Sequence, residues 1–240
     1  MLQTNVFLLP DLIPNSDILT GSCCVVIDVL RATTTIVTAM GNRASSIIPV
    51  ATVEQARLSA QQTGGMLGGE RDCVKLKGFD FGNSPAEYTR ERVENQEITL
   101  TTTNGTRALL SSVEADQVLV AAFANYSAVS REIANHPKVN IICAGTNGEI
   151  TLEDSLLAGA LAAGRTDSIL NDQALLAVDL WQPCTQADNL EQAIYDKLLT
   201  SRGGKNLQVV GMVSDIRLCA QLDTHSILPT FSRPTHTIQL

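Results

Sequence analysis

The residues best suited to chemistry are acids and an arginine that stand where short apolar runs end. Asp28 lies near the end of the apolar run 24–29, and Arg31 follows it closely. A carboxylate inside an apolar run is costly to bury unless a cation accompanies it. The pattern therefore leaves two alternatives for Asp28: an ion pair with a cation such as Arg31, or coordination of a metal ion.

Other acids occupy comparable positions. Glu70 and Asp72 follow the glycine turn at 68–69, and Glu153-Asp154 open an expected helix, where the helix dipole alone would explain them. Taken together, oxygen ligands at strand ends suit a hard cation such as Mg²⁺. This ion takes one or two protein carboxylates along with water and substrate oxygens.

Hydroxyl and amide side chains precede several expected helices, in the segments 33–35, 103–107 and 145–154. Free backbone N–H groups at a helix start, joined by such side chains, can bind phosphate or carboxylate. A threonine-rich turn is also a common helix cap, and Asn104-Gly105 could instead form a hairpin turn. The prediction of anion binding therefore depends on the placement of all three segments at strand ends.

Several kinds of chemistry find no support in the sequence. It contains neither a GxxxxGK[ST] nor a GxGxxG motif for nucleotides, and no GxSxG nucleophile turn. The cysteines show no CxxC spacing and are expected to be reduced, buried thiols. The histidines lie in a turn or near the C-terminus, which argues against zinc or histidine-based catalysis: His136, His225 and His236.

Charge and hydropathy restrict the partners. The formal net charge is −8 and no run of Lys or Arg relieves it, so nucleic acid is not expected as a partner. A small anion remains compatible with this charge, because a metal ion and helix starts act locally. No signal peptide or membrane-spanning stretch is recognised, and a cytoplasmic protein is expected.

Short apolar strands and helices alternate along the chain, and aromatic residues make up only 4% of it. This pattern predicts a three-layer α/β/α fold with a mainly parallel sheet, in which ligands bind at the carboxyl ends of the strands. The expected strands are 24–29, 46–50, 64–70, 98–103, 117–123, 139–143 and 226–231. The expected helices are 36–40, 52–62, one starting at Ser84-Pro85, 107–113, 125–135, 152–163, 171–181, 189–199 and 214–221, with a break at Gly203-Gly204.

An internal repeat is also predicted. At an offset of about 71 residues, Thr35 falls on Thr106 and the apolar run 47–50 falls on 118–121. We therefore predict a single unit over 1–240 that contains duplicated halves of βαβ type. The halves would cover about 21–95 and 96–165, followed by a helical part over 166–240. Chance alignment of two ordinary strand-helix patterns is the alternative.

Five motifs together resemble the 2-phosphosulfolactate phosphatase family. They are DVLRATTT at 28–35, GER at 69–71, GFDFGNSP at 78–85, TTNGT at 102–106 and LED at 152–154. Their order and spacing match from about residue 25 to 164. The resemblance implies an α/β fold with an internal duplication and Mg²⁺-dependent hydrolysis of 2-phospho-3-sulfolactate to 3-sulfolactate and phosphate, a step towards coenzyme M. The chain has no DxD phosphatase motif at Asp28, because Leu30 is the third residue.

The resemblance gives a hypothesis for the site. Asp28, Arg31 and Glu70 would be catalytic, and Mg²⁺ would be held by Asp28, Glu70 and Asp154. Which acid is a nucleophile and which a ligand stays open. The substrate's anionic groups would be bound by Thr33, Thr34, Asn83, Ser84, Asn104, Gly105, Thr106 and Arg107.

Other functions remain open at this point. The substrate could be another phosphorylated hydroxy acid, or the reaction could be that of an isomerase or lyase acting on a carboxylic acid. A third alternative is an anion-binding module without catalysis, in which the acids only cap helices. A homo-oligomer is also left open, because the Ala/Leu-rich segment 156–163 could face either the core or a partner.

Overall fold

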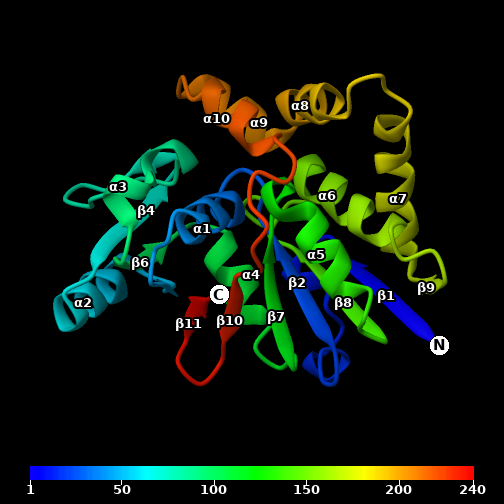
Figure 1. Cartoon of the computed structure of the whole chain (residues 1–240), viewed down its shortest axis with the longest axis horizontal. Helices are drawn as coiled ribbons and strands as arrows, with labels where there is room; N and C mark the ends of the chain where they lie inside the picture. The colour runs from blue at the N-terminus through cyan, green and yellow to red at the C-terminus, as the bar shows by residue number, and fades with distance from the viewer.

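The computed structural model describes residues 1–240, which form one large sheet with helices packed on it (Figure 1). The strand order is β5-β4-β6-β3-β11-β10-β7-β2-β8-β1-β9. The strands are β1 (Leu2–Phe7), β2 (Cys23–Ile27), β3 (Ser46–Pro49), β4 (Met66–Arg71), β5 (Val74–Lys75), β6 (Glu97–Thr101), β7 (Gln117–Ala121), β8 (Lys138–Cys143), β9 (Ser168–Leu170), β10 (Thr230–Ser232) and β11 (Thr237–Gln239).

The helices alternate with the strands up to β9 and then follow one another. They are α1 (Ala32–Gly41), α2 (Val53–Thr63), α3 (Arg90–Val93), α4 (Gly105–Ser111), α5 (Tyr126–Ile133), α6 (Leu152–Ala163), α7 (Asp172–Thr185), α8 (Leu190–Thr200), α9 (Arg202–Val209) and α10 (Val213–Cys219). Short 3₁₀ turns are η1 (Pro10–Leu12), η2 (Ser16–Ile18), η3 (Pro85–Glu87) and η4 (Phe123–Asn125). None of these helices combines the length and apolar character needed to cross a bilayer.

The sheet consists of two parallel parts joined by a hairpin. Strands β4, β6 and β3 are parallel to one another, as are β7, β2, β8, β1 and β9. The antiparallel hairpin β10–β11 lies between them, where Thr230 pairs with Leu119 and Ile238 pairs with Ile47. The predicted α/β fold with a mainly parallel sheet is confirmed, whereas the single strand expected at 226–231 is a hairpin that begins at Thr230.

Two units with the same order of elements interlock in this sheet. One unit runs β2-α1-β3-α2-β4, and the other runs β6-α4-β7-α5-β8. The first strand of each unit is inserted into the other unit, so that β2 lies between β7 and β8, and β6 lies between β3 and β4. Each unit thus lacks its central strand without the other. That the units arose by duplication stays a prediction.

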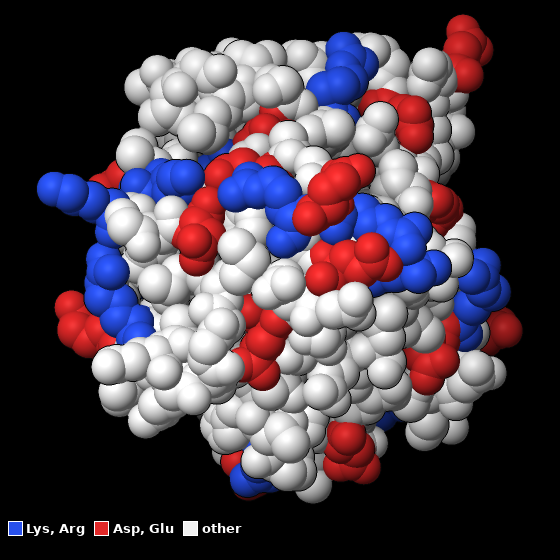
Figure 2. Space-filling view, turned by 60° about the vertical axis from the view of Figure 1, so that its left-hand side comes forward, with Lys and Arg blue, Asp and Glu red and all other residues white.

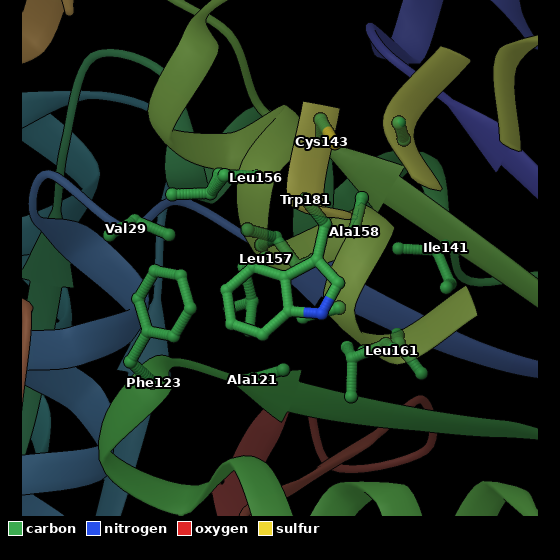
Figure 3. Packing of buried hydrophobic residues seen from close by; sticks show 14 of the residues in the cluster. Val29, Ala121, Phe123, Ile141, Cys143, Leu156, Leu157, Ala158, Leu161 and Trp181 are labelled. Carbon is green, nitrogen blue, oxygen red and sulfur yellow. The ribbon is translucent and has the colours of Figure 1, made fainter. Parts of the chain in front are cut away.

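Apolar side chains cover both faces of the sheet. Along β2, Val25 and Ile27 belong to a core cluster with α6 and α7, while Val26 belongs to a second cluster with α1 and α4. Strand residues alternate between faces, so this division follows directly from the apolar run. In the first cluster the rings of Phe123 and Trp181 stack with centroids 6.3 Å apart among leucines of α6 (Figure 3).

Two expected helix boundaries are wrong. The helix expected at Ser84-Pro85 is only the 3₁₀ turn η3, after which the buried Tyr88 stacks on Phe81 and the chain leaves helical geometry. The expected break at Gly203-Gly204 is instead the first turn of α9, capped by the Ser201 hydroxyl, which accepts from the Gly204 N–H.

Glycine is required there by packing rather than by a turn. A Cβ on Gly204 would lie within 1.9 Å of the Leu198 carbonyl oxygen, so α9 approaches the end of α8 too closely for any other residue.

Strands β1 and β9, which extend the sheet at one edge, were not expected from the sequence.

The hairpin gives a test of how the two parallel parts are held together. Ile238 is fully buried between them, so Ile238→Ala should lower the free energy of unfolding by about 2–5 kcal/mol. The exposed neighbour Gln239 serves as the control, because Gln239→Ala should stay within about 0.5 kcal/mol of the wild type. Urea unfolding of both variants measures this difference. Equal stabilities of the two variants would refute the joining role of the hairpin.

Candidate active site

The carboxyl ends of strands from both parallel parts meet at one small pocket of about 70 Å³. Strands β2 and β8 approach it from one part of the sheet and β4 and β6 from the other, while α9 closes it from above (Figure 1). The lining residues are mostly polar: Asp28, Leu30, Arg31, Glu70, Asp72, Cys73, Asn83, Thr103, Asn104, Thr146, Asn147, Gly203 and Asn206.

Asp28 is the buried acid at the floor of this pocket, with only 8% of its surface exposed. Its Oδ1 accepts a hydrogen bond from the Ala32 N–H at the start of α1 (3.2 Å). Gly105, the first residue of α4, packs against it, and a Cβ there would come within 2.8 Å of Asp28 Oδ2. The two helix starts therefore meet at this carboxylate, and only glycine fits at position 105.

Burial gives Asp28 an unusual protonation equilibrium. Loss of hydration raises the pKa of Asp28 to about 7. The Ala32 N–H opposes this rise, whereas the negative charges of Glu70 and Glu153 add to it and Arg31 lowers it.

Glu70 connects the two strands on the other side of the pocket. Its Oε1 accepts hydrogen bonds from the N–H and the hydroxyl of Thr103, at 3.0 and 3.1 Å, and its Oε2 accepts from the Cys73 N–H at 2.8 Å. The carboxylate therefore fixes the turn after β4 to the loop after β6. It lies in the same pocket as Asp28, as the sequence predicted for strand ends.

The arginine at this site has a different partner from the one considered in the sequence. Arg31 Nη1 forms an ion pair with Asp215 of α10 (2.6 Å), and Nη2 donates to the Cys73 carbonyl (3.0 Å). The alternative of a direct Asp28–Arg31 ion pair is therefore wrong. Coordination of a metal ion by Asp28 stays a prediction.

The acids at the start of α6 lie where they were expected, but their carboxylates have backbone partners. Asp154 accepts from the N–H groups of Val29 (2.8 Å) and Gly145 (3.0 Å), and it does not line the pocket. Glu153 accepts from the Gly203 N–H (3.1 Å), and its other oxygen has no partner. Burial raises the pKa of both acids. No three Asp, Glu, His or Cys side chains are grouped closely enough to hold a metal ion by themselves.

Two of the amides predicted to bind substrate do line the pocket. Asn83 is buried, and its side-chain oxygen has no hydrogen-bond partner. Asn104 precedes α4, and its side-chain oxygen accepts from the Asn147 N–H (3.0 Å). A buried amide without a partner is expected where a ligand supplies the missing bond.

Most of the predicted hydroxyls instead stabilise the loops. Thr33 bonds to the backbone of Asp28, Thr34 donates to the Val29 carbonyl, and neither lines the pocket. The Thr106 hydroxyl accepts from the Thr102 N–H, and the Thr106 N–H donates to the Thr102 hydroxyl. These threonines therefore shape the helix starts and present no hydroxyl to the pocket.

Ser84 and Arg107 also have protein partners. The Ser84 hydroxyl donates to Asp215 (2.8 Å) rather than facing the pocket. Arg107 is exposed, pairs with Asp11, and does not line the pocket, so its predicted role in binding substrate has no support in its placement.

Sequence reasoning missed part of the pocket. Thr146 and Asn147 follow β8 and lie in the segment 145–154, which the sequence predicted as an anion-binding helix start without naming these two residues. Asn206 lies on α9 and Asp215 on α10, and neither had any local sequence pattern to mark it.

The raised pKa of Asp28 predicts a pH-dependent stability of the metal-free protein. An unfolded Asp titrates near about 3.9, so the folded chain holds the proton more tightly between that value and about 7. This contribution to stability is fully present below the unfolded pKa and is lost as the pH rises through the folded one. The Asp28→Asn side chain cannot ionise. The free energy of unfolding of this variant, relative to that of the wild type, should therefore rise by roughly 1–3 kcal/mol as the pH increases from 5 to 8.

Urea unfolding of both proteins with a chelator at the two pH values measures this gain. A stability difference that is the same at both pH values would show that burial does not perturb Asp28.

Comparison with known proteins identifies the family. The family described as 2-phosphosulpholactate phosphatase matches residues 7–234. A protein of Symbiobacterium thermophilum named "Probable 2-phosphosulfolactate phosphatase" is 42% identical over 228 residues, covering 92% of this chain and 95% of the relative. Relatives of the same name from Pseudothermotoga lettingae and Gloeobacter violaceus are 41% identical over 208 residues (87% and 88% covered) and 38% over 233 residues (95% and 94%). The chain belongs to the 2-phosphosulpholactate phosphatase family, as its five motifs predicted.

Proposed function

We propose that this chain is a phosphoric monoester hydrolase that converts 2-phospho-3-sulfolactate into 3-sulfolactate and phosphate. Its place in this phosphatase family supports the reaction class and the substrate. The observation that carries the proposal in the structure is the meeting of Asp28, Glu70 and the unpartnered amide of Asn83 in one small polar pocket.

The charge of the pocket supports the use of a divalent cation. The substrate carries a phosphate, a sulfonate and a carboxylate, yet Asp28, Glu70 and Asp72 line the pocket. The only arginine among the lining residues is already paired with Asp215. An anion of this kind would be repelled unless a cation lies between it and the acids.

The residues present fit Mg²⁺. This ion keeps several waters and takes only one or two protein carboxylates, which Asp28 and Glu70 provide, and the Asn83 amide is a further oxygen donor. The ion would neutralise charge on the phosphoryl oxygens. Asp154 as a further ligand stays a prediction without support from its contacts, since both of its oxygens accept from backbone N–H groups.

The other polar side chains of the pocket are suited to hold the substrate. Asn104, Asn147 and Asn206 can donate amide hydrogens to sulfonate or carboxylate oxygens without adding charge. Asp28 either contacts the cation or attacks phosphorus, and its burial favours a role in which a positive charge accompanies it.

The surface agrees with a small substrate. On the face shown in Figure 2, Lys and Arg side chains lie interspersed with Asp and Glu, an arrangement that does not favour nucleic acid. A role in coenzyme M synthesis, a cytoplasmic location and a homo-oligomer stay predictions.

Removal of the metal tests the role of the two acids. With a chelator, phosphate release from 2-phospho-3-sulfolactate should stop, and added Mg²⁺ should restore it. Asp28→Asn and Glu70→Gln should each lower kcat/KM by roughly 100-fold or more, because several kcal/mol of charge stabilisation are lost. Each should also weaken Mg²⁺ binding in calorimetry.

The exposed Asp167 provides the control, since Asp167→Asn makes the same change of charge far from the pocket lining. Full turnover by the chelated enzyme, or a normal Mg²⁺ affinity in both pocket variants, would reject the metal.

A comparison of substrates tests the identity of the anion. If the pocket recognises the sulfonate through hydrogen bonds to a charged group, 2-phospholactate, which lacks it, should have a kcat/KM lower by roughly 10- to 150-fold. Colorimetric phosphate assays on both esters decide this. Equal rates would favour another phosphorylated hydroxy acid, and tight binding without any phosphate release would favour the non-enzymatic alternative.

A further inference from the structure

A buried ion pair links the pocket to the C-terminal helices. Arg31 Nη1 lies 2.6 Å from Asp215 Oδ2, and the two side chains are only 2% and 4% exposed. Arg31 stands at the start of α1 and Asp215 lies in α10, far apart in the sequence. A charge pair buried this deeply is costly to dehydrate, so its net contribution to the free energy of folding is small. Stability therefore does not explain its presence.

The partners of the pair fix the direction of the guanidinium. Arg31 Nη2 donates to the Cys73 carbonyl, and the second oxygen of Asp215 accepts from the Ser84 hydroxyl at 2.8 Å. Cys73 lines the pocket beside Arg31, and Ser84 follows the pocket amide Asn83. The ion pair therefore holds together the first helix start, the turn after β4 and the loop that carries Asn83.

The same C-terminal segment touches the pocket from a second direction. The Gly203 N–H at the start of α9 donates to Glu153, and Gly203 and Asn206 line the pocket. A Cβ on Gly203 would come within 2.1 Å of Glu153 Oε1, so the contact is close. Helix α9 thus lines the pocket, and α10, which lies beside it at the top of Figure 1, contacts the pocket residue Arg31.

The position of Asp28 shows what the pair prevents. Arg31 and Asp28 line the same pocket, yet the two form no ion pair. Without Asp215, the guanidinium would be a buried cation that has lost its counter-ion, and the unpaired Asp28 carboxylate in the same pocket would be a favourable new partner. Such a pair would occupy the carboxylate that the proposed cation needs.

We propose that Asp215 is a positioning residue that holds the Arg31 guanidinium at the pocket wall and so leaves Asp28 available for the divalent cation. This inference rests on the function proposed above. It assigns to α10 a role in the reaction without contact between Asp215 and the substrate.

The test uses the full-length protein and the near-isosteric variant Asp215→Asn, which can keep the hydrogen bond to Ser84 but loses the charge. We expect Asp215→Asn to weaken Mg²⁺ binding and to lower kcat/KM, each by roughly 10- to 100-fold. Asp188→Asn, an exposed acid before α8, is the matched control and should change neither quantity.

A second substitution separates positioning from general damage to the fold. Arg31→Gln removes the cation that would otherwise turn towards Asp28, so the double variant R31Q/D215N should regain the Mg²⁺ affinity of the wild type. It should also be no less active than R31Q alone, because Asp215 would act only through Arg31. Thermal unfolding curves define a temperature at which all variants are folded for these measurements.

Two results would overturn the proposal: unchanged Mg²⁺ affinity and kcat/KM in D215N, or a double variant whose Mg²⁺ affinity stays as low as that of D215N. Failure of the proposed function looks different. In that case the wild type releases no phosphate from 2-phospho-3-sulfolactate, while the Mg²⁺ affinities of D215N and R31Q/D215N still decide the role of Asp215.

Discussion

The site depends on the contact between the two helix starts, where Gly105 of α4 packs against the Asp28 carboxylate in front of α1. This contact exists because β2 and β6 are each inserted into the opposite unit of the sheet. It removes Asp28 from water and brings the strand end that follows β6 next to it. A carboxylate held there without its own counter-ion leaves the pocket short of positive charge. The proposed divalent cation would supply that charge.

Much of the central site could be predicted from the sequence. Asp28, Glu70, Asn83 and Asn104 share one pocket. Asp28, Glu70 and Asn104 were predictable because each stands at or near the end of an apolar run, and the carboxyl ends of parallel strands meet at one edge. Asn83 was predicted only from the family motif at 78–85. The α/β fold class was predictable from the alternation of strands and helices up to α6, because strands and helices each have a periodic local pattern of apolar residues. The family followed from motifs that lie in these same loops.

The parts that could not be predicted depend on contacts between distant segments. Nothing near Arg31 indicates that its partner is Asp215, and nothing near Gly203-Gly204 distinguishes a close helix contact from a break. A strand was expected at 226–231, but not that it forms the hairpin β10–β11, which joins β7 and β3 through one residue pair on each side. Threonines near a helix start fit both capping and anion binding, whereas the hydroxyls of Thr33 and Thr34 donate to carbonyls of the loop before α1 and do neither.

The interlocked sheet has a consequence for how the pocket can treat its ligand. An assembly of two identical copies of one unit would present the same side chains at both helix starts. A single chain is free of this symmetry, and here the position after β2 carries the acid Asp28 while the position after β6 carries the neutral Thr102. The two helix starts that meet at the pocket therefore differ in charge, although acids line the pocket on both sides through Asp28 and Glu70. A molecule whose two ends differ chemically requires such an asymmetry.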